Sequence, residues 1–528
     1  MAQEYDVIIA GCGNNGLTVG AYLAKAGLKV LGIERAERIG GGAMTREVTV
    51  PGFKHDIHAL NLRFLRMSRI VQDLELEKFG VRFVGGSDAL NAHLLEDGRC
   101  IVRYKDLEKT CQQIARFSKH DAEMYRQFYY DTLELRRNIV KSYTRPPAMP
   151  LGRLGELAKT LEGQKLAYLQ ITSALNVIDR YFDSEAVQNW MHASATAYGS
   201  PPDFPVTGLG VISLQMQMHD HPLVQVEGGS SVVTDALGRI IEANGGDLLT
   251  GRPIEQITVQ NNRATGVRLA DGTEFRANML VVAGLGHRLL LETVAHEAMG
   301  AEFTRGLQKL RPEDHVAFGL HLALKQAPYY EKAAEFNPDV QKVLFVNLGF
   351  ERREAYHEMY DDARNGQPPR NIGGTTFVPT NWDPTLAPTG RATAGMWLSS
   401  CYRLNGDAQN WDAYKEELAD RILERWRFYS PNLTSENILG RHAHSPADVE
   451  RDNPSFFEGS QMHISTLPDQ SGIFRPMPGW SNYRTPVDGL YVAAASCHPT
   501  GGVSGMPGYN AVEQIAQDFD LKKWWSAE

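Results

Sequence analysis

The sequence lacks long hydrophobic runs and has few cysteines. Its apolar stretches are far shorter than the ~18 residues that span a bilayer. Its first residues, MAQEYDVIIAGCG, place acidic residues rather than a basic region before a short apolar run, unlike a secretory signal. The 5 cysteines of the 528 residues are scattered without CxxC spacing, so nothing indicates a disulfide framework. We expect a soluble, cytoplasmic protein that at most touches a membrane surface.

Basic stretches and metal-ligand clusters are also missing. The chain has 54 Lys and Arg against 63 Asp and Glu, a formal net charge of −9, and no long basic run. Because sequence-independent binding of nucleic acid needs a basic face, we expect no nucleic-acid partner. His219, Asp220 and His221 are adjacent, but no second anchoring group accompanies them, so we expect no metal site.

Length, glycine and one well-ordered N-terminal pattern are present instead. The chain is long enough for roughly two to four domains, and 49 of its residues are glycine. Residues 5–10, YDVIIA, read as a buried strand, NGLTVGAYLAKAG as the helix after it, and residues 29–33, KVLGI, as a second strand. This order predicts parallel pairing with a right-handed crossover.

The loop between that strand and helix, GCGNNG, has the GxGxxG spacing of dinucleotide-binding sites. Gly11 permits the tight turn, Gly13 lets the backbone approach a pyrophosphate, and Gly16 lets helix and strand pack closely. The helix N-terminus supplies N–H groups and positive dipole, and we expect the Asn15 amide to face the same phosphates. Glu34, at the end of the second strand, is placed to accept hydrogen bonds from ribose hydroxyls. The combination predicts dinucleotide binding.

A second glycine cluster follows the acidic residue, in ERAERIGGGAMT at 34–45. Here the chain resembles the flavoprotein family of phytoene desaturases, carotenoid ketolases, retinol saturases and, more distantly, amine oxidases. In that family the second cluster, matched by Gly40 and Gly41, binds the FAD phosphates. The family commonly has arginine where this chain has Gly42. The resemblance implies cofactor contacts from Arg35 through Gly42, and the segment PGFKHDIHAL at 51–60 resembles one that passes near the isoalloxazine.

The resemblance continues in two later segments. Residues 227–283 resemble the second FAD segment, in which a backbone group near Ile254 or Ile257 meets the adenine; we select Ile257. Residues 475–516 resemble the C-terminal flavin segment. The fold implied is α/β, a discontinuous Rossmann-type FAD-binding domain with a mixed α+β substrate domain, as in p-hydroxybenzoate hydroxylase and amine oxidases. The expected FAD-binding parts are 1–60, 225–290 and 485–528. The expected substrate-domain parts are 61–224, which we expect to be largely helical, and 291–484.

The stretch YVAAASCHPTGGVSGMPGYN, residues 491–510, fits the flavin ring of such a site. A reduced flavin carries negative charge and needs N–H donors or a helix N-terminus. We expect the N–H groups of Gly501, Gly502 and Val503 there, followed by a helix that starts near Pro507 or Tyr509.

Three neighbouring residues have alternative roles. Many relatives have aspartate where this chain has Ser496, whose hydroxyl is expected to serve instead. His498 is the candidate catalytic base, although it could equally bond backbone, because hydride transfer needs little help from a base. Cys497 fits a small core residue better than a covalent flavin link, so FAD is expected to bind non-covalently. Further histidines and a tyrosine are pocket candidates: His55, His58, His463 and Tyr509.

The predicted activity is a two-electron dehydrogenation, with hydride passing to flavin and then electrons to oxygen or a quinone. The resemblance favours C–C desaturation of a hydrophobic, isoprenoid or alicyclic substrate. Three alternatives stay open: a flavin amine or alcohol oxidase, a nicotinamide dehydrogenase, and a non-redox module like the Rab GDP-dissociation inhibitors, which bind prenylated proteins.

Residues 58–79 fit either a membrane-contacting amphipathic helix or a core helix, and the oligomeric state is open. Aromatic residues that suit an apolar tunnel, or equally a core, are Trp190, Phe345, Phe377 and Trp397.

Overall fold

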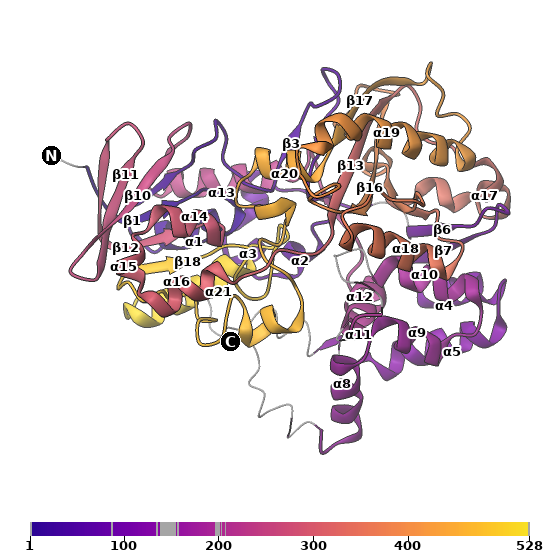
Figure 1. Ribbon diagram of the computed structural model, residues 1–528, viewed down its shortest axis with the longest axis horizontal. Coiled ribbons are helices and arrows are strands. Elements are labelled where there is room, and N and C mark those ends of the chain that lie inside the picture. Colours follow the sequence, from indigo (N-terminus) through magenta and orange to yellow (C-terminus); the bar gives the residue numbers. More distant parts are fainter. Residues whose placement is uncertain are drawn as a thin grey trace.

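The computed structural model describes residues 3–85, 88–133, 136–137, 155, 158–195, 201, 203–205 and 207–525. They form two lobes, one around each of two seven-stranded sheets (Figure 1). The N-terminus belongs to the first lobe, and the chain returns to that lobe at its C-terminal end.

The first sheet has the order β10-β11-β12-β1-β2-β9, with β18 beside β12. Its parallel part runs from β9 through β2, β1 and β12 to β18, and β10 and β11 extend it antiparallel. The strands are β1 (Gln3–Ala10), β2 (Val30–Ile33), β9 (Asp247–Leu249), β10 (Ile254–Gln260), β11 (Arg263–Leu269), β12 (Glu274–Ala283) and β18 (Leu490–Val492).

The central strand β1 is buried on both faces because its alternate side chains enter two different cores. Val7 and Ile9 pack with the helices α1 (Asn14–Lys25), α13 (Ser231–Ala243) and α21 (Met506–Asp518). Ile8 and Ala10 enter the core on the other face, which α14 (His287–Thr293), α15 (His296–Met299) and α16 (Ala301–Gln308) cover. The predicted strand–helix–strand unit and the parallel pairing of β1 with β2 are confirmed.

Parallel pairing gathers the carboxyl ends of strands that are distant in sequence. Ala10 is paired with Ile33 on one side and Ala283 on the other, and Ala283 is paired with Val492. The loops that follow these strands, including both glycine-rich stretches of the sequence, therefore leave the same edge of the sheet. In α/β sheets this edge is where ligands bind.

The second sheet has the order β17-β13-β16-β15-β14-β6-β7 and is antiparallel except where β14 meets β6. The long helix α19 (Asn410–Tyr429) covers it with Trp411, Ile422 and Trp426. Its strands are β6 (Ala89–Leu94), β7 (Cys100–Tyr104), β13 (Val316–Leu324), β14 (Phe345–Leu348), β15 (Gly374–Phe377), β16 (Ala392–Ser400) and β17 (Ile438–His444).

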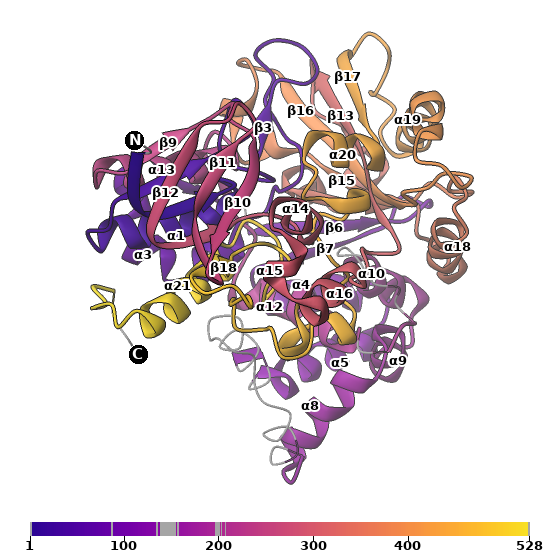
Figure 2. The same ribbon diagram turned by 60° about the vertical axis from the view of Figure 1, so that its left-hand side comes forward.

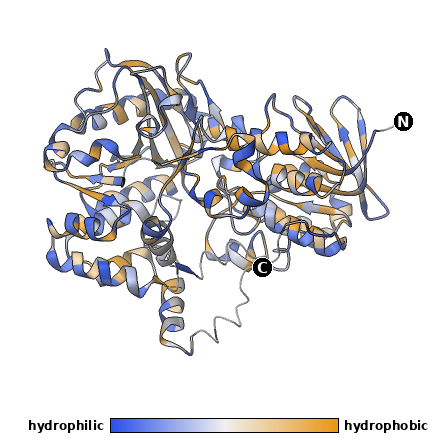
Figure 3. Cartoon of the chain, turned by 180° about the vertical axis from the view of Figure 1, so that it is seen from behind, coloured by the Kyte–Doolittle hydropathy of each residue, from blue (hydrophilic) through white to orange (hydrophobic). Residues whose placement is uncertain are grey.

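A helical layer lies beside the second sheet (Figures 1 and 2). Figure 3 shows apolar residues along the strands and the inner sides of the helices, as expected for elements that share a core. The helices of this layer are α4 (Leu107–Ala115), α5 (Lys119–Asp131), α8 (Leu161–Ile171), α9 (Ala174–Tyr181), α10 (Glu185–Ala195), α11 (Gly208–Gly210) and α12 (Gln217–Asp220). Other helices are α17 (Glu331–Phe336), α18 (Arg353–Arg364) and α20 (Pro446–Asp452).

Two expectations for residues 58–224 need correction. Residues 58–79 form no single helix but three short ones, α2 (Arg63–Met67), α3 (Ile70–Asp73) and a 3-10 turn, Leu76–Phe79. Their Leu62, Leu65 and Ile70 are buried in the core beside α1, which agrees with the core alternative. The hairpin β6–β7 interrupts the expected helical region because Asp97-Gly98 turns the chain between two apolar strands.

Among the described residues no helix is long and apolar enough to cross a membrane. The domain limits stay predictions.

Candidate cofactor-binding and active site

A cavity of about 1570 Å³ lies between the lobes, at the carboxyl edge of the first sheet. Loops after β1, β2 and β18 line one part of it, and residues of the second sheet line another. Single-ligand pockets are typically about 300–1,000 Å³. This volume therefore has room for a large cofactor together with a substrate.

The two N-terminal glycine clusters touch each other at one side of the cavity. The Gly40 N–H donates to the Cys12 carbonyl at 2.8 Å, and a Cβ on Gly41 would lie 3.0 Å from the Gly13 Cα. Gly41 also has a φ of +57°, which favours glycine. A Cβ on Gly16 would meet the Gly11 carbonyl oxygen at 2.6 Å, so α1 packs directly against the preceding turn. The close helix–turn packing expected at Gly16 is present, whereas the approach of a pyrophosphate to Gly13 stays a prediction.

Glu34 lies buried on the cavity wall. Its Oε2 accepts the Cys12 N–H and its Oε1 accepts the Ala36 N–H, both at 3.0 Å. Burial raises the pKa of the carboxyl, and these N–H groups and the nearby Arg35 partly offset that shift. The two hydrogen bonds fix the carboxylate at the end of β2, where a ribose of a bound dinucleotide would pass.

The C-terminal stretch meets the N-terminal loop directly. The Asn14 Nδ2 donates to the Gly502 carbonyl at 3.3 Å, across 488 residues of sequence, and to the Asn15 Oδ1 at 3.1 Å. A Cβ on Gly508 would lie 2.3 Å from the Asn15 carbonyl oxygen, so α21 packs tightly on the start of α1. The first residues of α1, together with Met506 of α21, line the cavity, and neither helix has an acidic residue in its first turn. Two positive helix ends therefore face the same space.

Most of the predicted cofactor residues line this cavity. They are Gly11, Gly13, Asn15, Gly16, Glu34, Arg35, Gly41, Gly42, Gly501, Gly502 and Val503. Three others lie behind the wall. Gly40 packs against Thr234 of α13, Ile257 is buried in the core of the first sheet, and Ser496 is buried beyond Ala493–Ala495, which do line the cavity. Ile254, at the start of β10, lines the cavity in place of Ile257.

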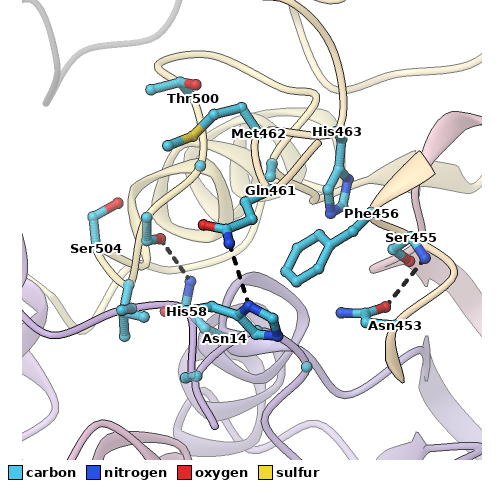
Figure 4. Close-up of a pocket in the computed structure, with 18 of the residues that line it drawn as sticks. Asn14, His58, Asn453, Ser455, Phe456, Gln461, Met462, His463, Thr500 and Ser504 are labelled. Carbon is cyan, nitrogen blue, oxygen red and sulfur yellow. Dashed lines mark hydrogen bonds between the residues drawn. The ribbon is translucent and has the colours of Figure 1, made fainter. Parts of the chain in front are cut away.

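Figure 4 shows a second wall, formed by His58 and residues 453–463. The Phe456 ring lies between His58 and His463, with ring centroids 5.1 and 5.8 Å away. It also fills the space beside Gly42, since a Cβ there would lie 2.5 Å from the Phe456 Cζ. Phe456 therefore occupies the space that a side chain at position 42 would need.

The histidines on this wall are neutral. Burial lowers the pKa of both His58 and His463 to about 3. The Gln461 side-chain amide approaches the His58 Nδ1 at 3.3 Å (Figure 4). These rings are therefore weak bases that contribute shape and hydrogen bonding rather than charge.

The other predicted candidates divide between wall and core. His498 is buried, lines the cavity, and accepts the Tyr483 hydroxyl with its main-chain carbonyl at 3.0 Å. The Cys497 thiol instead donates to the Val492 carbonyl at 3.4 Å in the core, and burial raises its pKa to about 11. His55, whose Nε2 is 2.9 Å from the Thr49 hydroxyl, and Tyr509, packed against Tyr22, do not line the cavity.

The part of the cavity inside the second lobe is largely apolar. Phe345 on β14 and Trp397 on β16 line it, together with Phe350 and Met359. Of the remaining aromatic candidates, Phe377 and Trp190 are buried in hydrophobic clusters and do not line the cavity.

The His219–Asp220–His221 segment has structural partners. Tyr125 and the Lys105 carbonyl approach the two ring nitrogens of His219 at 2.9 and 3.0 Å, and Asp220 pairs with Arg136. In the described part of the chain, His120, Asp121 and Asp183 have ligand atoms within 4.8 Å of one another. The Asp121 carboxylate accepts the Asp183 and Ser184 N–H groups, so it anchors the start of α10.

The geometry fits a dinucleotide that ends in a ring system. Bare glycine backbone, two helix N-termini and a fixed carboxylate suit a pyrophosphate and a ribose. Residues that sequence analysis missed also line the site: Asn14, Glu313, Asn453, Phe456, Gln461, Met462, Thr500 and Ser504. Asn14 belongs to the GxGxxG loop, and Thr500 and Ser504 belong to the glycine-rich stretch 491–510. The others come from segments without a local motif.

Comparisons with known proteins support this interpretation. Residues 9–74 match a family model described as an NAD(P)-binding Rossmann-like domain. The chain is 28% identical over 558 residues to pyridine nucleotide-disulfide oxidoreductase domain-containing protein 2 of Rattus norvegicus, covering 98% of this chain and 94% of that one. It is 28% identical over 540 residues to a limonene dehydrogenase subunit of Castellaniella defragrans (99% and 96%), and 23% identical over 509 residues to a lycopene-forming phytoene desaturase of Pseudescherichia vulneris (94% and 96%). These relatives are consistent with the expected resemblance to the phytoene desaturase-like FAD-dependent oxidoreductases.

Solved structures confirm the fold. A putrescine oxidase triple mutant matches with a TM-score of 0.64 at 14% identity, covering 98% of this chain and 99% of that one. An oxidoreductase from Methanosarcina mazei matches with 0.62 at 18% identity (98% and 100%), and a Rab GDI from Plasmodium falciparum with 0.53 at 11% identity (100% and 100%). The expected α/β architecture, amine oxidase-like with a Rossmann-type domain, is confirmed, and a flavin-type cofactor is indicated.

Proposed function

We propose that this chain binds FAD non-covalently and removes two hydrogens from a C–C bond of a hydrophobic, isoprenoid or alicyclic substrate. The observation that carries the proposal is the continuity of one cavity, which joins a dinucleotide-binding edge to an apolar wall that includes Phe345 and Trp397. A substrate held against such a wall needs little polar recognition, because burial of its apolar surface supplies most of the binding free energy.

The relatives favour a hydrocarbon substrate. The limonene dehydrogenase subunit and the phytoene desaturase are each matched over nearly their whole length. Both names refer to oxidation of isoprenoid hydrocarbons, and this supports C–C dehydrogenation over amine or alcohol oxidation. The Rab GDI likeness concerns the fold alone, and a non-redox binding module gives no reason for the close approach of Gly13 and Gly41.

Each part of the wall has a task in this proposal. The start of α1 and the two glycine clusters hold the pyrophosphate, and Glu34 holds a ribose. The N–H groups of Gly501, Gly502 and Val503, with the N-terminus of α21, stabilise negative charge at the ring. A bound flavin supplies the two-electron acceptor for hydride. The buried Cys497 thiol is hydrogen-bonded within the core, which supports non-covalent binding.

Two measurements on the purified protein test the proposal. Unfolding in acid should release all FAD into the supernatant; flavin that stays with the precipitate would contradict non-covalent binding. The second measurement is anaerobic addition, one at a time, of carotenoid precursors, cyclic terpenes, alicyclic ketones, alcohols and amines. We expect a hydrocarbon from this panel to bleach the flavin. Bleaching by amines or alcohols alone would instead support the oxidase alternative.

The electron acceptor is part of the same proposal. Oxygen or a quinone should reoxidise the reduced flavin. Stopped-flow mixing of the reduced protein with oxygen in buffer, and with vesicles that contain the quinone, measures the two reoxidation rates. A faster rate with the quinone-loaded vesicles would support peripheral membrane contact, whereas a rate no faster than that with oxygen in buffer would count against it.

A further inference from the structure

Glu313 lies on the cavity wall where the chain enters the second lobe, three residues before β13 begins. Its side chain is partly exposed, although the groups around it enclose it from most of the solvent. The Ser460 hydroxyl donates to its Oε2 at 3.1 Å. Ser460 stands beside Gln461 and His463, which belong to the wall shown in Figure 4. Glu313 therefore faces the same space as the predicted flavin site.

This carboxyl group is not held in an ion pair. Arg475, a buried cation whose charge acts on Glu313, directs its terminal nitrogens to main-chain carbonyls, including those of Met462 at 2.7 Å and Ala495 at 2.8 Å. In the described residues no salt bridge reaches Glu313. A carboxylate with one hydroxyl partner stays available to a substrate.

The surroundings keep Glu313 protonated near neutral pH. Burial is the main cause, and the adjacent Asp314 adds to it, whereas Ser460 and Arg475 act against it. The result is a pKa raised to about 8. His463 on the neighbouring loop is neutral because burial lowers its pKa to about 3. When it is ionised, Glu313 is therefore a stronger base than an ordinary carboxylate.

Three other titratable groups on the wall, Glu34, Asp452 and His58, are already engaged or bind a proton weakly. Glu34 accepts two main-chain N–H groups, and Asp452 pairs with Arg46 and His444. His58 has a pKa lowered to about 3, so it binds a proton weakly.

We propose that the Glu313 carboxylate is the catalytic base that takes the second hydrogen of the dehydrogenation as a proton. The inference rests on the proposed function. One substrate C–H bond breaks and its electron pair leaves as hydride to the bound flavin. The C–H bond on the adjacent carbon breaks as its proton passes to Glu313, and that electron pair forms the new C=C bond. In total the substrate gives one hydride to the flavin and one proton to Glu313, and it gains one C=C bond.

The test uses flavin-loaded full-length protein and the hydrocarbon that bleaches wild type. In wild type, the anaerobic bleaching rate should rise with pH through about 8 and then level off. Glu313→Gln should keep its flavin content and visible spectrum, but its anaerobic bleaching rate should be at least about a hundredfold lower than that of wild type, which is the usual contribution of a catalytic base. Asp314→Asn removes only the like charge beside Glu313, so it should keep the plateau rate and move the rise to lower pH.

Infrared spectroscopy supplies a readout that is independent of turnover. The wild-type protein should show a carboxyl C=O band that disappears as pH rises through about 8, and Glu313→Gln should lack it. A flavin-loaded Glu313→Gln variant that bleaches at the wild-type rate would overturn the inference and leave the proposed function intact. Wild-type flavin that no hydrocarbon bleaches would overturn both.

Discussion

At the scale of single residues, glycine decides how closely a dinucleotide can approach the backbone. Gly13 and Gly41 come from different clusters, and a Cβ on Gly41 would lie 3.0 Å from the Gly13 Cα. A methyl group here would push the two loops apart and cover main-chain N–H groups that a pyrophosphate needs. The effect should appear in cofactor affinity before it appears in the fold.

We therefore expect Gly41→Ala to weaken FAD binding at least about tenfold, which is about 1.4 kcal/mol. Gly245→Ala is the matched control, because Gly245 also has a positive φ, of +81°, but nothing lies within 4 Å of its added Cβ. Fluorescence titration of the apoproteins with FAD measures both. Equal losses in the two variants would show that backbone strain, not the close approach, sets the affinity.

Glu313 gives a pH-dependent stability with a definite sign. Its folded pKa of about 8 lies above the ordinary value of 4.5, so the fold holds this proton more tightly than the unfolded chain does. The resulting stabilisation is complete below pH 4.5 and is lost as pH rises through about 8. Between those limits the loss is at most about 1.4 kcal/mol per pH unit.

Glu313→Gln should therefore gain thermal stability relative to wild type between pH 6 and pH 9, as followed by Tm. The glutamine side chain does not titrate, so only the wild-type protein loses stability when the carboxyl group ionises. An unchanged Tm difference at the two pH values would mean that the carboxyl titrates in its ordinary range.

At the scale of elements, the contact between α1 and α21 joins the two halves of the cofactor site. A Cβ on Gly508 would lie 2.3 Å from the Asn15 carbonyl oxygen. Gly508→Ala should therefore cost about 1–3 kcal/mol of stability and also weaken FAD binding, because α21 moves away from the first turn of α1. The exposed Gln517 of the same helix offers a control in Gln517→Ala. If both variants unfold and bind FAD like wild type, the contact does not position the site.

Sequence patterns predicted elements best where the signal is local. The unit from β1 to β2 spans about thirty residues and its glycines fix the turn, so strand, loop and helix were all found. Ile257 was selected although Ile254 lines the cavity, because exposure along a strand depends on register that only the sheet reveals. The β6–β7 hairpin was missed, although Asp97-Gly98 between apolar runs is a recognisable turn signal.

The missed site residues share a different cause. Phe456 contacts Gly42 across more than four hundred residues, and Glu313 meets Ser460 from another segment. The residue spacing within either segment cannot predict such a contact, because the two segments meet only after both sheets have formed. The C-terminal glycines were found by family resemblance rather than by periodicity.

At the scale of the whole molecule, the account predicts that the first lobe binds the cofactor and that the second lobe binds the substrate. Trp397 belongs to the second sheet and lines the cavity away from the glycine clusters. Trp397→Ala should leave FAD content unchanged and lower the substrate-dependent bleaching rate at least about tenfold, mainly through weaker binding of an apolar ligand. Phe428→Ala, at an exposed site on α19, is the control. Loss of FAD from the Trp397 variant would contradict this division.

The central claim is that the cavity couples bound FAD to dehydrogenation of a C–C bond. Anaerobic mixing of the flavin-loaded protein with cyclic terpenes and carotenoid precursors, followed by mass spectrometry of the organic phase, tests it most directly. The account predicts that the flavin absorbance bleaches and that one equivalent of product with two fewer hydrogens and one more C=C bond appears per flavin. A protein that binds no FAD, or a flavin that bleaches only with amines or alcohols, would contradict it.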